Sequence, residues 1–226
     1  RLAEFFRGQP PRPDMIGGVK VVATSVNAGD AARQALESCI SKGGVALFPA
    51  DGLYGLACDP LNEKAIRRIH EIKGRDDGKS SAVMYLSPLA MRELIRDLGQ
   101  RVSEAAAKLL PGPVTLVVPN PRHRYPLACR EDQSRLGIRV IDGPLSGVRF
   151  PLFQTSANLS GEPAPSVFEG VVPEVREMVD LAIDGGRLTG LPSTVVDLTE
   201  YDELGEWEIL REGGMSRGDL IAALGR

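Results

Sequence analysis

Short apolar runs alternate with helical stretches along this 226-residue chain, and this alternation is the feature that most restricts its fold. Runs of this length between turn-forming residues are typical of buried strands. Some follow one another with no helical stretch between, so they cannot all be parallel neighbours, which need a long crossover connection. The pattern therefore predicts an α/β fold in which helices flank a twisted, mixed sheet. The predicted strands are residues 45–48, 82–86, 114–118, 136–141, 152–155, 181–184 and 193–198.

Apolar residues that recur every three or four positions predict the helices. Asp30 is a suitable N-cap for a helix that continues to Ile40, and Asn62 is one for a helix that ends at Lys73. The second helix carries apolar residues on one face, namely Ala65, Ile66, Ile69 and Ile72. Further helices are predicted from Ser87 to Gly99, from there to about Leu110, over 167–180 with an interruption near Pro173, and after Ser216.

The ends of the chain and its composition limit the class of protein. Residues 1–18 contain several prolines and end in two glycines, which predicts an arm or linker before one domain at residues 19–226. No apolar run approaches the roughly 18–20 residues of a membrane span, and the first residues do not resemble a secretory signal. We therefore expect a cytoplasmic protein without membrane contact. A net charge of −3 excludes a protein-wide attraction to nucleic acid, so RNA binding would need a local patch such as the arginines of 122–139.

Few residues are available for metal or covalent chemistry. The three cysteines, Cys39, Cys58 and Cys129, lack the spacing of a metal site, which favours reduced thiols. The two histidines, His70 and His123, are too few for a histidine-rich metal centre. We therefore expect no protein-bound metal and no histidine-activated nucleophile.

Two short polar motifs stand at the ends of predicted elements. Lys73-Gly74-Arg75 closes a helix, and Ser156-Ala157-Asn158 closes an apolar strand. Ammonium, guanidinium, hydroxyl and carboxamide groups together are suited to binding phosphates and carboxylates. Taken singly, the first motif could be a solvated helix end with cations near the helix dipole, and the second could be a polar turn. The two motifs predict a binding site only if the fold brings them together.

Several phrases occur together in one order along the chain. They are PADGLYGLAC at 49–58, Lys73-Gly74-Arg75, LPGPVTLVV at 110–118, LGIR at 136–139, TSANLSG at 155–161, STVVDL at 193–198 and Leu210-Arg211. From about residue 28 to residue 224 the chain resembles the YrdC-like family, the threonylcarbamoyl-AMP synthases. The resemblance implies a single α/β domain around a wide, positively lined cleft. It also implies an ATP-dependent nucleotidyltransferase that condenses L-threonine, bicarbonate and ATP and releases pyrophosphate.

The resemblance further implies partners and site residues. A separate transferase would pass the threonylcarbamoyl group to tRNA, and some family members are described as binding double-stranded RNA. Mg²⁺ would arrive on the ATP phosphates. Lys73, which also binds ATP, and Arg75 would be catalytic, because they hold phosphate and carbamate oxygens. The remaining implied contacts are Ser156, Asn158, Ser166 and Arg211 for ATP, and Ala50, Arg139 and Ser193 for the amino acid.

The chain departs from the family at the amino-acid end. The family phrase reads Pro-Thr-Asp/Glu-Thr, whereas here Ala50 and Gly52 replace both threonines, of which the first contacts the amino acid. Asp76 and Asp77 follow Arg75 where the family usually has proline. Three functions therefore remain open. They are threonylcarbamoyl-AMP synthesis, formation of another acyl- or carbamoyl-adenylate by a paralogous enzyme, and a double-stranded-RNA-binding module without catalysis.

Overall fold

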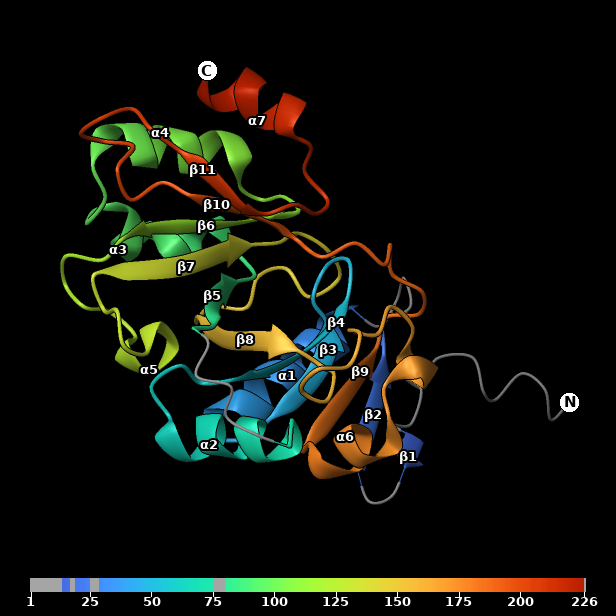
Figure 1. The fold of residues 1–226 in the computed structure, drawn as a ribbon. Coiled ribbons are helices and arrows are strands. Elements are labelled where there is room, and N and C mark those ends of the chain that lie inside the picture. Colours follow the sequence, from blue (N-terminus) through green and yellow to red (C-terminus); the bar gives the residue numbers. More distant parts are fainter. Residues whose placement is uncertain (1–13, 17–18, 25–28, 75–79, 226) are drawn as a thin grey trace, which may run out of the picture.

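The computed structural model describes residues 14–16, 19–24, 29–74 and 80–225. Within them, eleven strands form one sheet in the order β1-β2-β9-β3-β4-β8-β5-β7-β6-β10-β11 (Figure 1). Parallel pairs such as β5–β7 stand beside antiparallel pairs such as β4–β8, which confirms the predicted mixed α/β fold. The strands are β1 Asp14–Ile16, β2 Val19–Ala23, β3 Ala46–Pro49, β4 Tyr54–Cys58, β5 Ala82–Tyr85, β6 Val114–Pro119, β7 Arg135–Val140, β8 Leu152–Ser156, β9 Leu181–Asp184, β10 Thr194–Asp197 and β11 Glu208–Arg211.

Local capping signals place most of the helices where the sequence predicts them. The side chain of Asn62 accepts a hydrogen bond from the Ala65 amide at the start of α2, and Ser216 forms a capping box with Asp219 at the start of α7. Pro173 begins α6, which explains the interruption predicted there. The helices are α1 Gly29–Ser41, α2 Glu63–Ile72, α3 Arg92–Ile95, α4 Gln100–Leu109, α5 Pro126–Cys129, α6 Pro173–Met178 and α7 Arg217–Leu224, with 3₁₀ turns η1 Pro88–Met91 and η2 Phe168–Gly170.

The helix predicted from Ser87 to Gly99 is shorter and less regular than expected. Ser87 caps a 3₁₀ turn, and the α-helical part, α3, already ends at Ile95. Gly99 instead precedes α4, where a distant side chain supplies the cap. The Asp202 carboxylate accepts hydrogen bonds from the Arg101 and Val102 amides at 2.8 and 3.2 Å. A Cβ atom at Gly99 would lie 2.2 Å from that carboxylate, so glycine leaves the room the cap needs.

Five elements were not predicted, namely β1, β2, β4, β11 and α5. Strand β1 lies inside the stretch predicted as an arm, and its pairing with β2 makes residues 14–16 part of the sheet. Residues 1–13 and 17–18 lie outside the described residues, so the rest of the arm stays a prediction. Helix α5 begins at Pro126 within the basic, proline-rich stretch 119–136.

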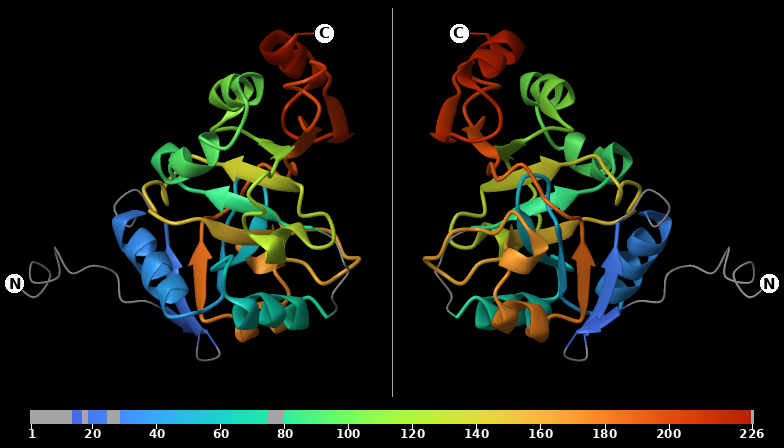
Figure 2. Two further views of the ribbon diagram at one scale, coloured as in Figure 1. Left: turned by 90° about the vertical axis from the view of Figure 1, so that its left-hand side faces the viewer. Right: turned by 90° about the vertical axis from the view of Figure 1, so that its right-hand side faces the viewer.

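Two hydrophobic clusters cover the two faces of the sheet. Along β3, Leu47 packs into the larger cluster beneath α2 and α4, and Phe48 packs into the smaller cluster beneath α1. This alternation is the period of two that a strand buried on both faces requires. Helices α4 and α7 lie together beyond β10 and β11, far from α1 and α2 (Figure 2).

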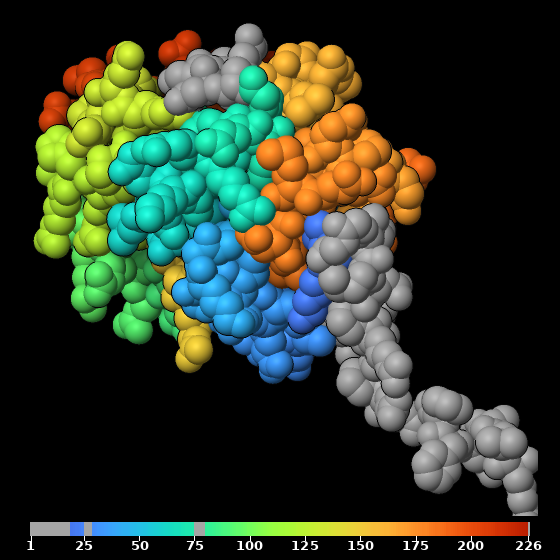
Figure 3. Space-filling model, turned by 90° about the horizontal axis from the view of Figure 1, so that it is seen from below, coloured from blue at the N-terminus to red at the C-terminus, as the bar shows by residue number. Residues whose placement is uncertain are grey.

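Helices α2 and α6 lie side by side on the underside of the molecule, next to α1 (Figure 3). Arg68 of α2 joins this surface by donating hydrogen bonds to the Met178 carbonyl and the Asp180 carboxylate, each at 2.5 Å. All three cysteines are free thiols, as predicted. In the described part of the chain, no helix is long and apolar enough to cross a membrane.

Candidate functional site

A cavity of about 1170 Å³ lies where the end of α2, the turn between β3 and β4, and strands β6, β7, β8, β10 and β11 meet. Its lining includes most of the described residues that the sequence singles out. Lys73, Ser156 and Asn158 line one side, whereas Ala50, Arg139, Ser193 and Arg211 line another. The fold therefore brings residues from distant parts of the chain around one space.

Lys73 joins the two polar motifs directly. It is the C-cap of α2, only 8% exposed. Its ammonium donates hydrogen bonds to the Ser156 carbonyl at 2.5 Å and the Asn158 carbonyl at 3.0 Å. The first motif is thus no solvated helix end, because a buried cation is held against the turn that follows β8. Arg75 lies outside the described residues, as do Asp76 and Asp77.

Asn158 presents an unsatisfied acceptor on the same side. Its amide nitrogen donates hydrogen bonds to the Leu159 and Glu162 carbonyls at 2.8 and 2.7 Å, which fixes the orientation of the side chain. The amide oxygen is buried and has no hydrogen-bond partner among the described residues. Because nearly all buried polar groups in proteins are paired, this oxygen is a group that a ligand donor or a water molecule would satisfy.

Arg139 of β7 is a second buried cation in the cavity lining. It is 6% exposed, and its guanidinium lies 3.4 Å from both the Ala50 carbonyl oxygen and the Asp51 carboxylate. These distances are long for hydrogen bonds to a cation, and the buried Nε atom has no partner among the described residues. Burial lowers the pKa of Arg139 to about 10, against the charge of Asp51, which raises it, so the guanidinium still carries its charge at neutral pH. The arginine therefore keeps unused donors for an anion.

The β3–β4 turn and the segment before β10 pack closely at this side. Asp51 adopts a left-handed backbone conformation with φ 77°, and the Gly52 carbonyl accepts a hydrogen bond from the Gly190 amide at 2.9 Å. A Cβ atom at Gly52 would lie 1.9 Å from the Leu191 carbonyl oxygen. A side chain at position 52 would displace that segment, which gives a physical reason for glycine where the family has threonine.

Ser193 and Arg211 lie next to one another. The Ser193 hydroxyl is 2.8 Å from the Thr115 hydroxyl, and Arg211 donates hydrogen bonds to the carbonyl and hydroxyl oxygens of Ser193 at 2.9 and 3.1 Å. Arg211 is also close enough to Arg139 to lower the pKa of that residue. The structure therefore groups Arg211, predicted as an ATP contact, with the predicted amino-acid contacts.

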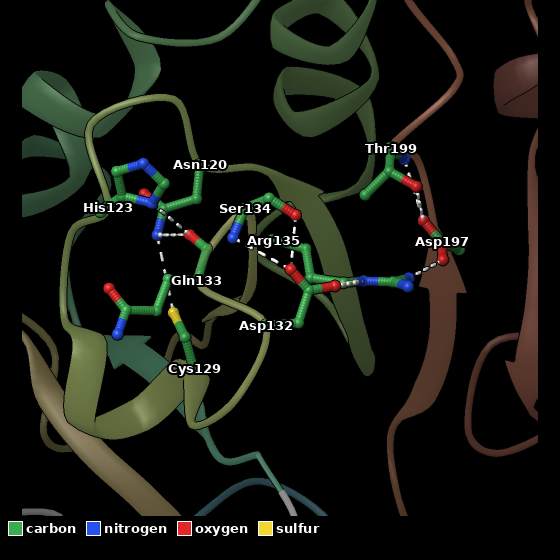
Figure 4. A network of polar contacts seen from close by, with 9 residues as sticks. All are labelled: Asn120, His123, Cys129, Asp132, Gln133, Ser134, Arg135, Asp197 and Thr199. Carbon is green, nitrogen blue, oxygen red and sulfur yellow. Dashed lines mark hydrogen bonds and ion pairs between the residues drawn. The ribbon is translucent and has the colours of Figure 1, made fainter.

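A third part of the lining is formed by β7 and β10, whose side chains meet in Figure 4. Arg135 pairs with Asp197, and Asp132 accepts a hydrogen bond from the Ser134 hydroxyl. The buried Asn120 amide donates hydrogen bonds to the Arg124 and Gln133 carbonyls, which holds the loop before β7 in place.

The described part of the cavity lining contains charged side chains of both signs, and Arg75 lies outside the described residues, so the positively lined cleft stays a prediction. Among the described residues the cations are Lys73, Arg135, Arg139 and Arg211, and the acids are Asp132, Glu162, Asp197 and Glu208. Positive charge is therefore concentrated at two places, around Lys73 and around Arg139, and elsewhere acids offset it.

Thr115 and Gln154 line the cavity without having been predicted, and one predicted residue, Ser166, lies outside the lining. Ser166 does not line the cavity; it lies beyond Gly190, and its carbonyl accepts a hydrogen bond from Leu188. Thr115 and Gln154 both line the cavity and were not assigned roles from the sequence. Thr115 lies within a phrase that the family resemblance uses, whereas Gln154 has no local signal beyond its place in an apolar strand.

Fold and site together define a class of protein. This is a mixed α/β protein whose sheet supports a large polar cavity, lined by cationic groups from distant parts of the chain. The model of the Sua5/YciO/YrdC family, described as telomere recombination, matches residues 38–213. The chain belongs to this family, which confirms the resemblance found in the sequence.

Individual relatives extend the comparison. A threonylcarbamoyl-AMP synthase of Pyrococcus abyssi is 30% identical over 195 residues, covering 82% of this chain and 55% of the relative. A threonylcarbamoyl-AMP synthase of Pseudomonas aeruginosa is 33% identical over 165 residues, which cover 70% of this chain and 88% of the relative. The structure of Pyrococcus abyssi Sua5 complexed with L-threonine matches with a TM-score of 0.75 at 26% identity, covering 91% of this chain and 60% of that one. The chain thus spans about half the length of the Pyrococcus synthase.

Proposed function

We propose that this chain is an L-threonylcarbamoyladenylate synthase, which uses L-threonine, bicarbonate and ATP and releases pyrophosphate. The observation that carries the proposal is the presence of two cationic groups around one cavity, Lys73 beside the turn after β8 and Arg139 beside the β3–β4 turn. The names of the Pyrococcus and Pseudomonas relatives support it. So does the threonine bound to Pyrococcus Sua5.

The two ends of the cavity suit different parts of this chemistry. Around Lys73, an ammonium and the free amide oxygen of Asn158 would hold the nucleotide, with Ser156 as a further contact in the cavity lining. Arg75, which lies outside the described residues, and Ser166, which does not line the cavity, stay predictions from the family resemblance. Around Arg139, a guanidinium with unused donors would bind the amino-acid carboxylate. The neighbouring hydroxyl of Ser193 would contact the same ligand, and Arg211 would extend from there toward the ATP phosphates.

The proposed reaction needs positioning more than covalent catalysis. The threonine amine would combine with bicarbonate to give a carbamate and water. A carbamate oxygen would then bond to the α-phosphorus of ATP while the bond from that phosphorus to pyrophosphate breaks. Holding the two anions in line and offsetting their charge is a task for Lys73 and its neighbours.

Mg²⁺ would enter with the ATP phosphates, since no group of three or more acidic, histidine or cysteine side chains in the described residues could hold a metal ion. The product would pass to a separate transferase that modifies tRNA. Cytoplasmic location stays a prediction from the sequence.

Pyrophosphate release tests the proposal. We expect release that saturates with threonine and that falls when carbon dioxide and bicarbonate are removed. Release with a different amine alone, or with carbamoyl phosphate, would instead identify a paralogous adenylate-forming enzyme. No release with any of these substrates, together with salt-dependent binding of duplex RNA, would identify an RNA-binding module.

One observation argues against the RNA-binding alternative. The arginines of 122–139 that were its support are largely paired within the protein. Arg122 and Arg124 contact Asp97 at 3.0 and 2.5 Å, and Arg135 pairs with Asp197. Arginines neutralised in this way contribute less to the attraction of phosphates than free ones would.

A further inference from the structure

Gln154 is a buried polar side chain that the proposed reaction has not yet used. It lies in the middle of β8, where it pairs with Ala57 of β4 and Ala82 of β5, so its backbone is fixed on both sides. It is 9% exposed, and what remains accessible faces the cavity. Its carboxamide has no hydrogen-bond partner in the described part of the chain. Neither of its polar atoms is among the fully buried side-chain atoms without a partner, so the carboxamide reaches the cavity, where a ligand can pair with it.

The carboxamide is directed toward the amino-acid end of the cavity. A Cβ atom added at Gly55 would lie 2.8 Å from the Gln154 Nε2 atom and 3.0 Å from the Ala50 Cβ atom. The carboxamide of Gln154 and the methyl group of Ala50 therefore border the same small space. Glycine at position 55 therefore provides the space in which Gln154 approaches Ala50. On the other side of Ala50, its carbonyl oxygen is 3.4 Å from the Arg139 guanidinium. A carboxamide and a guanidinium thus flank the same residue.

We propose that Gln154 is a specificity-determining residue that hydrogen-bonds the β-hydroxyl of the amino acid whose carboxylate Arg139 binds. This inference rests on the proposed function. A carboxamide can both donate to and accept from a hydroxyl, and it cannot pair with a methyl group. The Ala50 side chain offers only a methyl group there, so Gln154 supplies the polar contact at this wall. The cavity therefore selects β-hydroxy amino acids, threonine and serine, over valine and 2-aminobutyrate.

The size of the selection follows from the burial of Gln154. A site built to hydrogen-bond a substrate hydroxyl rejects an analogue without it strongly, because a buried polar group is then left unpaired. We expect the intact protein to prefer threonine over valine by about 100-fold or more in kcat/KM for pyrophosphate release. Valine is the appropriate competitor because it has the shape of threonine with a methyl group in place of the hydroxyl.

Gln154→Met tests the inference, since methionine has nearly the same length and cannot make the contact. We expect kcat/KM for threonine to fall by about 10-fold or more, with kcat/KM for valine unchanged or raised, so that the preference collapses. The thermal unfolding midpoint should change little, because methionine has a similar volume and no hydrogen bond within the described residues is lost. Gln34→Met, the same change at an exposed position of α1, should leave both the preference and the midpoint unchanged.

The outcomes separate this inference from the function on which it rests. If the unaltered protein releases no pyrophosphate with threonine, the proposed function fails and the inference fails with it. If the unaltered protein uses threonine and folded Gln154→Met keeps the full preference over valine, the inference alone is overturned. Should Gln154→Met fold poorly, Gln154→Leu is measured in its place, and a retained preference there overturns the inference equally.

Discussion

The ammonium of Lys73 serves both the fold and the proposed chemistry. Because it donates to the Ser156 and Asn158 carbonyls, Lys73→Met should lower the free energy of unfolding by about 1–2 kcal/mol. It should also lower kcat/KM for ATP by about 100-fold or more, since a charge that offsets developing anionic charge is lost. Denaturant unfolding and pyrophosphate release measure the two effects. The control is Lys64→Met, an exposed position on the same helix, and wild-type turnover in folded Lys73→Met would refute the assignment.

The guanidinium of Arg139 is expected to act on the amino acid alone. Arg139→Gln removes the charge near Asp51 and should raise the KM for threonine by about 10- to 100-fold, the range for a lost charged hydrogen bond. Binding of a fluorescent ATP analogue should change little, because Lys73 and Asn158 lie elsewhere in the cavity. The matched control is Arg149→Gln, whose side chain is 86% exposed. An equal loss of nucleotide binding would contradict the division of the cavity into two ends.

Single residues differ in how far their roles could be predicted from sequence. Lys73, Ser156 and Asn158 stand in short polar motifs at the ends of elements, and such motifs can be recognised in the sequence as candidate binding residues. Gln154 stands inside an apolar strand, and nothing local indicates whether its side chain meets water, another side chain or a cavity. That depends on Ala50 and Gly55, about a hundred residues away in sequence, so only the fold reveals it.

Among the elements, the β3–β4 turn depends on the absence of a side chain at Gly52. Gly52→Ala would place a Cβ 1.9 Å from the Leu191 carbonyl oxygen and 2.8 Å from the Thr189 hydroxyl, so the two segments must separate. We expect the free energy of unfolding to fall by about 1–3 kcal/mol, the usual range for overpacking. The KM for the amino acid should also rise, because both segments line the cavity.

Gly218→Ala in α7 is the control for that substitution. There the nearest heavy atom, the Ser216 hydroxyl oxygen, lies 3.6 Å from the added Cβ, so no clash arises. Alanine should stabilise the helix by up to about 1 kcal/mol relative to glycine. If Gly52→Ala were as well tolerated as this change, in both unfolding and kinetics, the close packing of residues 189–191 on the turn would be wrong.

Elements whose signals are local were predictable, and those that depend on distant partners were not. Asn62 and Ser216 cap their own helices, so α2 and α7 could be located from sequence alone. Strands β1 and β2 are short and follow a glycine- and proline-containing stretch. Strand β2 is held by pairing with the distant β9, and β1 by pairing with β2. Helix α4 is capped by Asp202 from a hundred residues away, which no local pattern could indicate.

At the scale of the whole molecule, the reactivity of the three thiols can be used to measure local opening in three different elements of the fold. Cys39 lies in α1, Cys58 in β4 and Cys129 in α5. Burial raises the pKa of Cys39 to about 12, with a further contribution from Asp180, and burial also raises the pKa of Cys58 and Cys129. We expect an aromatic disulfide reagent to react slowly with the folded protein at pH 8 and rapidly with all three thiols in denaturant. Rapid reaction of one thiol under folding conditions would show that its element opens by itself.

The same thiols set a direction for stability at high pH. A thiol whose pKa is raised in the folded state stays protonated there while the unfolded chain loses its proton. The contribution of Cys39 is therefore present in full below pH 9 and is lost as the pH rises toward about 12. Unfolding measured between pH 8 and pH 11 should show a decline that is smaller in Cys39→Ala. An equal decline in both proteins would exclude Cys39 as a source.

The pair formed by Asp51 and Arg139 has a consequence for how a carboxylate is received. The chain itself already places an acid 3.4 Å from this guanidinium, in a side chain that is 34% exposed and can turn toward solvent. An incoming carboxylate would therefore use the donors that Asp51 leaves unused, and the nearby charge of Asp51 would offset part of the long-range attraction. The affinity of Arg139 for a carboxylate ligand should accordingly vary little with ionic strength. Ligands are then distinguished by shape and by their remaining polar groups, because net charge gives little advantage.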